Sequence, residues 1–239
     1  MKFYRILAAV LSVICLSSCA DFLTEAPTTA LSEGTVYSDE ANLEAGVIGV
    51  YWSLKTSNYS WTTQMSEFCS FPSILIHWKD NRTAENYIQS LRLTMFSHSA
   101  ENQGLYDYLY ASIYKCNKMI EAMSISPVDQ TYKNEIEGEV KFIRAWQYFA
   151  AVRFWGDIPL ILNTPKNIDE TDAPRVHYME VYKQILSDLE YAEQNMRTPE
   201  RVAEVGGMTG RPNKWAATAL KASVYMQIAC LLENKEYQF

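Results

Sequence analysis

The apolar and polar positions of residues 129–156 follow a helical period more clearly than any other part of the chain. From Phe142 onward nearly every residue is apolar or aromatic. Only Glu137, Lys141, Arg144, Gln147 and Arg153 interrupt the run, and the first four of these are spaced by three and four. A helix that is polar along one narrow stripe must be covered by neighbours on two or more sides. The pattern therefore predicts a central helix from about Asp129 to Gly156 that is exposed to solvent only along that stripe.

Gly156 predicts the end of this helix, because glycine adopts the left-handed conformation that closes a helix. Pro159 follows three residues later and cannot rejoin a helix. We therefore expect Asp157 to Leu162 to leave in an extended conformation. The residues from Ile158 to Leu162 could pair as a short strand.

Four further segments carry apolar residues at spacings of three and four. They predict one helix that begins near Ser38, two that run from about Asn102 to Met123 and from about Met179 to Met196, and one that follows Asn213. Residues 57–102 fit no clean period, and we interpret them as a long aromatic-rich loop that contains short helices.

The predicted fold is all-α, with long antiparallel helix pairs packed as in tetratricopeptide repeats. A 34-residue self-similarity is not evident, so we expect a repeat-like arrangement rather than a strict repeat. Large aromatic residues on predicted helices are expected in the core, namely Trp146, Trp155 and Trp215.

The first residues have the pattern of an export signal. Lys2 and Arg5 supply the positive start, and Ile6 to Leu16 form an apolar core that is too short to span a membrane. Small residues precede Cys19, as in a lipoprotein cleavage box whose cysteine is acylated and becomes the new N-terminus. The alternative is an ordinary signal with an incidental cysteine. We expect a signal peptide at residues 1–18, a lipid-anchored tether at 19–37 and a helical domain at 38–239.

The run K-F-I-R-A-W-Q-Y-F-A-A-V-R-F-W-G-D-I-P-L, residues 141–160, resembles the signature helix of the SusD/RagB family of bacterial surface lipoproteins. The run Leu16-Ser17-Ser18-Cys19, the helix with Tyr110 and Asn117, and the run V-Y-K-Q-I-L-S-D-L-E-Y-A agree with this resemblance. It implies a protein that binds glycans, or in some members peptides, and covers a TonB-dependent transporter of SusC type. It also implies a further C-terminal part, because family members are usually much longer and this chain stops just after a helix.

The formal net charge of −7, from 28 acidic and 21 basic residues, argues against a polyanionic partner such as nucleic acid. Beyond the signal segment and Cys19, the remaining cysteines are Cys69, Cys116 and Cys230. Their spacing contains no C-x-x-C pair, so buried thiols are expected, with a single disulfide as the alternative.

Groups that could carry catalysis do not converge in the sequence. His77, His98 and His177 lack the spacing of metal ligands such as H-E-x-x-H, so we expect neither a metal site nor a cofactor. Asp188 and Glu190 lie two positions apart on a predicted helix and point in different directions, which argues against a glycosidase.

The acidic cluster formed by Glu135, Glu137 and Glu139 is interpreted as a solvated helix face. Glu137 precedes Lys141 by four positions, which predicts a favourable ion pair along the helix. A catalytic role is not assigned to any residue.

Ligand binding is better supported, because the flat C–H faces of sugars stack on tryptophan and tyrosine while sugar hydroxyls need amide and charged partners. The segment from Tyr59 to Tyr87 offers both kinds of group. The predicted ligand contacts are Trp61, Trp78, Asp80, Asn81 and Arg82. The alternative is that these aromatic residues only pack against the helical scaffold.

Together these observations predict a lipoprotein of the cell outer membrane that captures oligosaccharides, leaves their bonds unchanged and delivers them to a TonB-dependent transporter. The alternatives are a peptide receptor of RagB type and a non-enzymatic helical scaffold for protein partners. An enzyme is the least favoured alternative, because converging acid, base and nucleophilic groups are not evident.

Overall fold

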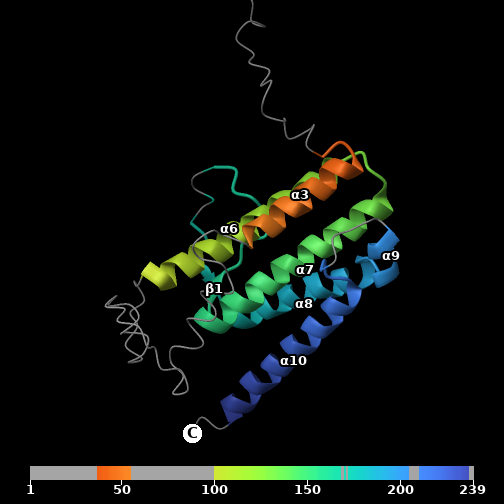
Figure 1. Cartoon of the computed structure of the whole chain (residues 1–239). Helices are drawn as coiled ribbons and strands as arrows, with labels where there is room; N and C mark the ends of the chain where they lie inside the picture. Colours follow the sequence, from red (N-terminus) through yellow and green to blue (C-terminus); the bar gives the residue numbers. More distant parts are fainter. Residues whose placement is uncertain (1–36, 55–99, 168–169, 171, 205–209, 237–239) are drawn as a thin grey trace, which may run out of the picture. The chain divides into compact units, whose positions relative to one another are not determined.

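The computed structural model of the chain describes residues 37–54, 100–167, 170, 172–204 and 210–236. Helices account for 77% of these residues, so the fold is all-α, as predicted. The helices are α3 (Glu40–Ser53), α6 (Ala100–Ile125), α7 (Gln130–Trp155), α8 (Tyr178–Asn195), α9 (Pro199–Glu204) and α10 (Lys214–Glu236) (Figure 1).

The long helices pack in the order in which they follow one another along the chain. Helix α7 lies between α6 and α8, and α10 packs against α8 (Figure 1). Helix α3 contacts both α6 and α7. Successive packing of neighbouring helices is the repeat-like arrangement that the sequence pattern predicted.

Local signals explain where the helices begin and end. Asp39 caps α3, because its carboxylate accepts a hydrogen bond from the backbone N–H of Asn42 at 2.8 Å. Asp129 caps α7 in the same way, accepting from the backbone N–H of Thr131 at 2.8 Å. Gly156 follows α7 with a φ of +66°, which confirms the predicted helix end. The five long helices match the predicted segments to within two residues.

The core forms two clusters on either side of α7. One joins α6, α7 and α8 around Tyr148 and Tyr182, and the other joins α3, α6 and α7 around Leu43 and Met119. Helix α3 approaches α6 closely at Gly46, where an added Cβ would lie 2.8 Å from Met119 Sδ. A side chain at this position would therefore force the two helices or Met119 to shift.

The prediction that the polar stripe of α7 is exposed to solvent is wrong at the centre of the helix. Arg144 and Gln147 are buried, with 4% and 1% of their surface exposed, because neighbouring helices also cover this side of α7. Glu137 and Lys141, nearer the start of the helix, remain partly exposed and form the predicted ion pair at 2.7 Å.

The segment after α7 is extended, as predicted, and it pairs with a strand that the sequence pattern did not reveal. Strand β1 (Ile158–Pro159) runs antiparallel to β2 (Arg175–Val176), with Ile158 opposite Val176. The short helix α9 was also not predicted. Both β2 and α9 are too short to show a clear period.

One face of α10 is uncovered among the described residues. Ala217 and Val224 are fully buried on the side that packs against α8. Trp215 and Met226 are exposed on the opposite side, and Tyr225 and Leu232 are exposed beside the buried side. The predicted core position of Trp215 is therefore wrong, since 59% of this residue is exposed. By length and composition alone, residues Lys214–Glu233 could cross a membrane, but their packing against α8 makes them part of the helical bundle.

Candidate ligand-binding site

The predicted ligand contacts and the predicted lipid anchor lie outside the described residues. This applies to Trp61, Trp78, Asp80, Asn81 and Arg82 in segment 55–99, and to Cys19 in segment 1–36.

The two helices that border segment 55–99 are described, and they are joined directly. Ser53 is the last residue of α3, and its hydroxyl is hydrogen-bonded to the hydroxyl of Ser112 on α6 at 3.0 Å. Both serines are buried. The predicted binding segment therefore leaves from one helix and returns to another that is packed against it.

A set of polar side chains fixes the extended segment that follows α7. Tyr110 on α6 donates a hydrogen bond to the carbonyl oxygen of Pro159 at 2.7 Å, and Asn117 donates to that of Ile161 at 2.8 Å. The Tyr148 hydroxyl donates to the same Ile161 carbonyl at 2.7 Å and accepts from the Ile161 N–H at 2.8 Å. Side chains thus satisfy backbone groups that a neighbouring strand would otherwise pair.

A buried ion pair lies beneath this segment. Arg144 donates from Nε and Nη2 to the two carboxylate oxygens of Asp188, at 2.8 and 2.7 Å, and from Nη1 to Asn117 Oδ1 at 2.8 Å. Burial by itself lowers the pKa of Arg144, but the hydrogen bonds and charge of Asp188 outweigh it, and the net shift is upward. Asp188 is therefore committed to a structural pair, which leaves it unsuited to the role of a catalytic acid.

A second ionic network joins α3, α7 and the residues that precede α10. Glu139 accepts hydrogen bonds from Arg211 Nε at 2.8 Å and from the Tyr51 hydroxyl at 2.5 Å. Arg211 also pairs with Glu44. Burial and the nearby Glu139 carboxylate raise the pKa of Tyr51, so its hydroxyl remains a donor at neutral pH. Glu139 is only 3% exposed, and its predicted place on a solvated face is wrong.

Arg197 extends this network along α7. Its Nε donates to Glu135 Oε2 at 2.8 Å, and its Nη2 lies 2.7 Å from Glu44 Oε1 without the alignment of a hydrogen bond. Glu135 is thus also paired rather than simply solvated. These contacts have no local signal in the sequence, because Arg197 lies 62 positions from Glu135 along the chain.

Groups of the kind that hold a metal ion are not found among the residues that the structure describes. His177 is the N-cap of α8, where its Nδ1 accepts from the Met179 N–H at 3.2 Å. His77 and His98 lie in segment 55–99. Of the described cysteines, Cys116 is buried as predicted, whereas Cys230 is exposed, and neither forms a disulfide.

Comparison with known proteins agrees with the helical architecture. A family model for SusD-like proteins, described as starch-binding and associating with the outer membrane, matches residues 21–226. SusD-like protein P25 of Formosa agariphila is 28% identical over 95% of this chain and 44% of its own length. A SusD-like protein of Bacteroides ovatus is 24% identical over 93% of this chain and 39% of its own length.

Solved structures show the same fold. A laminarin-binding SusD-like protein superposes with a TM-score of 0.67 at 20% identity, over 80% of this chain and 40% of that protein. A SusD-like protein of Bacteroides fragilis superposes with a TM-score of 0.65 at 24% identity, over 81% of this chain and 36% of that protein. The chain thus spans less than half the length of these relatives.

Proposed function

Since the chain belongs to the SusD-like family, we propose that it is part of a surface lipoprotein that captures oligosaccharides and delivers them to a TonB-dependent outer-membrane transporter. The observation that carries this proposal is the family match over residues 21–226, which includes segment 55–99 and all the described helices except the end of α10.

The predicted ligand contacts supply the chemistry that sugar binding needs. In this proposal Trp61 and Trp78 stack on the apolar faces of sugar rings, because flat aromatic surfaces fit C–H faces without demanding hydrogen bonds. Asp80 accepts hydrogen bonds from sugar hydroxyls, Arg82 donates them, and the amide of Asn81 does both. A few polar groups beside aromatic platforms are sufficient to orient a ligand.

The described helices supply a rigid support for such a site. The segment that carries the predicted contacts begins after α3 and ends before α6, and these helices are held together by the Ser53–Ser112 hydrogen bond and by the core around Met119. A support that does not need to reorganise lowers the entropic cost of binding. The function proposed is binding without bond chemistry.

The proposed anchor is an acylated Cys19 in the outer membrane. Each buried methylene of an acyl chain contributes about 0.8 kcal/mol, and two or more chains give a stable anchor. Radiolabelled palmitate should be incorporated by the wild-type chain and not by the Cys19→Ala variant. Retention of label by that variant would contradict the assignment.

Ligand binding is tested by affinity electrophoresis and calorimetry with a panel of plant, algal and bacterial glycans. We expect Trp61→Ala and Trp78→Ala each to weaken binding at least about tenfold, which corresponds to 1.4 kcal/mol. Trp215→Ala is the matched control, because Trp215 is an exposed aromatic residue on α10, outside the proposed site. Binding of peptides but not glycans would favour a peptide receptor, and binding of neither would leave a protein scaffold.

A further inference from the structure

Two buried polar side chains on α6 and α7 have no hydrogen-bond partner among the described residues. They are Tyr108 on α6, whose hydroxyl is unpaired, and Gln147 on α7, whose amide nitrogen and oxygen are both unpaired. Tyr108 is 7% exposed and Gln147 is 1% exposed. Because the large majority of buried polar atoms in proteins are hydrogen-bonded, these atoms indicate that a further polar group binds beside them.

The contacts of α3 with α6 fix the position of Tyr108. The two helices are antiparallel: Ser53 at the end of α3 is bonded to Ser112, and Gly46, seven residues earlier, approaches Met119, seven residues later. Tyr108 lies four residues from Ser112 on the same side of α6. It is therefore about 6 Å beyond the end of α3. Figure 1 shows α6 and α7 extending past this end.

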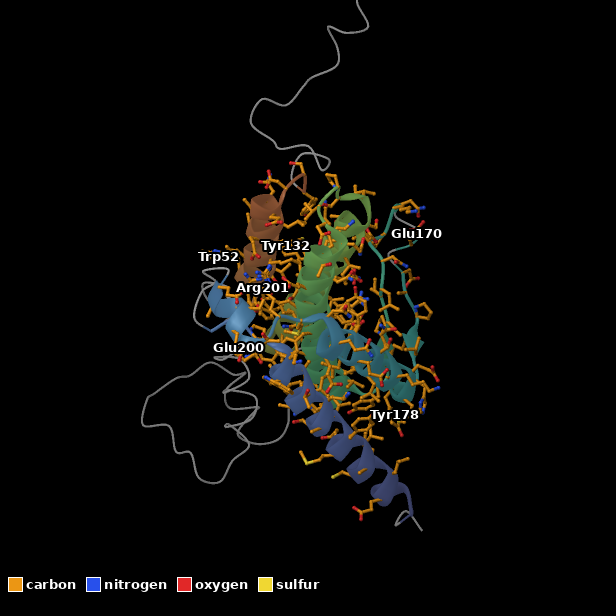
Figure 2. The ribbon with its side chains drawn as sticks, turned by 90° about the vertical axis from the view of Figure 1, so that its right-hand side faces the viewer. Trp52, Tyr132, Glu170, Tyr178, Glu200 and Arg201 are labelled. Carbon is orange, nitrogen blue, oxygen red and sulfur yellow. The ribbon has the colours of Figure 1, made fainter. Side chains whose placement is uncertain are left out.

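The position of Gln147 follows from the contacts of α3 with α7. These helices run parallel, because Tyr132 on α7 donates to Glu44 at 2.6 Å and Tyr51 on α3 donates to Glu139 at 2.5 Å. Figure 2 labels Tyr132 where α7 faces α3. Both pairs are 88 positions apart, so the end of α3 at residue 53 is level with residue 141. Gln147 lies six residues further along α7, about 9 Å past the end of α3.

Gln147 also lies on the side of α7 that α3 covers. It follows Val140 and Ile143 by seven and four positions, which places the three residues on one side of the helix. Val140 and Ile143 belong to the core cluster that contains Leu43 and Val47 of α3. The unpaired atoms of α6 and α7 therefore border the space that continues the line of α3 between these two helices.

The same pair of helices holds another stretch of backbone with the same kinds of side chain. Tyr110 and Asn117 on α6 and Tyr148 on α7 donate hydrogen bonds to the carbonyl oxygens of Pro159 and Ile161. A side-chain amide carries both donor and acceptor groups, which matches the N–H and C=O of a peptide unit, and a tyrosine hydroxyl can pair with either. The unpaired groups thus have the chemistry that binds extended backbone.

The backbone directly after α3 is the group best placed to fill this space. Leu54 is the last described residue before segment 55–99, and the neighbouring Ser53 is fixed by its bond to Ser112. Since an extended chain advances by at most about 3.3–3.6 Å per residue, residues 55–58 can reach both unpaired side chains. Buried backbone also needs partners for its own N–H and C=O groups. The requirements of the two sides are therefore complementary.

We propose that Gln147 and Tyr108 bind the backbone of residues 55–58 and so fix the course of the proposed ligand-binding segment from its start. The inference rests on the proposed function, which assigns Trp61 and Trp78 in this segment to the ligand. Gln147 and Tyr108 are positioning residues in this proposal and do not touch the ligand. A segment that is held at its start loses less conformational freedom when the ligand binds.

Three variants of the full chain test this contact by amide hydrogen exchange. Gln147→Met removes both polar groups but keeps an unbranched side chain, and Tyr108→Phe removes only a hydroxyl. Tyr110→Phe is the matched control, because its hydroxyl on the same helix binds Pro159 instead. We expect exchange at residues 55–58 to become at least about fivefold faster in the first two variants and to be unchanged in the control.

Nuclear Overhauser effects in the wild-type chain test the contact directly. We expect them between the side-chain amide protons of Gln147 and backbone N–H groups of residues 55–58. Effects to water alone would overturn the proposal. So would exchange at residues 55–58 that ignores both variants or responds equally to Tyr110→Phe. Should Gln147→Met unfold, the wild-type spectrum and Tyr108→Phe, which removes a single heavy atom, decide the question.

Glycan affinity separates this inference from the proposed function. If the wild-type chain binds glycans, we expect Gln147→Met to weaken binding at least about threefold in calorimetry and Tyr110→Phe to leave it unchanged. Unchanged affinity in Gln147→Met would overturn the positioning role while the proposed function stands. Absence of glycan binding by the wild-type chain would remove the proposed function. The exchange and Overhauser measurements need no ligand, so they would still test the contact with residues 55–58.

Discussion

Arg144 on α7 and Asp188 on α8 form a bidentate ion pair whose side chains are 5% and 2% exposed. Asn117 on α6 accepts a third hydrogen bond from the same guanidinium, so one arginine links three consecutive helices. A fourth contact comes from Gln184, whose amide donates to Asp188 at 3.0 Å. The charges are thus taken out of water only where hydrogen bonds replace it.

Removal of one partner from this pair is expected to be strongly destabilising. Asp188→Ala leaves a buried guanidinium uncompensated and should lower the free energy of unfolding by about 3–5 kcal/mol. Urea unfolding followed by circular dichroism measures this loss. The double variant Arg144→Met with Asp188→Leu should lose much less than the sum of the single variants. Additive losses would show that the two side chains are not coupled in the folded protein.

Two glycines should respond to alanine with opposite signs. Gly156 has a φ of +66°, which is unfavourable for residues with a Cβ, so Gly156→Ala is expected to cost about 1–3 kcal/mol. Gly49 lies in a helix, where alanine is favoured by roughly 0.5–1 kcal/mol and open space accommodates its Cβ. Thermal unfolding of the two variants measures both effects. An equal response would contradict the backbone explanation, because added Cβ atoms meet no neighbour at either position.

Helix positions were predictable because their signals are local. The cap at Asp129 and the glycine at 156 act on residues only a few positions away, and α7 indeed runs from Gln130 to Trp155. Burial was less predictable, because it depends on which other helix packs nearby. Arg144 was expected in water but is enclosed with Asp188, and Trp215 was expected in the core but is exposed.

For the candidate site, the sequence predicts which side chains have suitable chemistry but not where they lie. Trp61 and Trp78 can be recognised as stacking groups from the sequence, but their places lie outside the described residues. The ionic network could not be predicted at all. Arg211 pairs with Glu44, which is 167 positions away, and the charge pattern around either residue does not indicate its partner.

Glu44 should make stability depend on pH in the acidic range. Burial raises the pKa of Glu44, but the hydrogen bonds from Tyr132 and Arg211 and the ion pair with Arg197 outweigh it, so the net shift is downward from 4.5. A lowered pKa in the folded state stabilises the protein above pH 4.5, and this contribution is lost as the pH falls through the folded-state pKa.

The expected result is a Glu44→Gln variant that is less stable than wild type at pH 7 and approaches it as the pH falls below 4.5. Urea midpoints measured from pH 7 to pH 3.5 test this. Glu180→Gln is the control, because Glu180 is 55% exposed and pairs with Lys183 at the surface. A constant difference between wild type and Glu44→Gln at every pH would rule out this linkage.

The two described cysteines should differ in reactivity. Burial raises the pKa of the Cys116 thiol to about 12, so at pH 8 it is both protonated and inaccessible. Cys230 is exposed on α10. In a chain that begins at residue 20 and carries Cys69→Ser, Ellman's reagent should titrate one thiol in the native state and two in urea. Two rapidly reacting thiols in the native protein would show that Cys116 is not enclosed.

The two sides of α10 should tolerate charge very differently, although the residues compared are only two positions apart. Val224 is fully buried, so Val224→Glu places a carboxylate in the core and should cost at least about 3 kcal/mol. Met226 is 64% exposed, so Met226→Glu should change stability by no more than about 0.5 kcal/mol.

The Met226→Glu variant should also reduce light scattering at high protein concentration, because the added charge interrupts the exposed apolar face. Thermal unfolding and static light scattering measure these effects. Equal destabilisation by both variants would mean that α10 is covered on both sides.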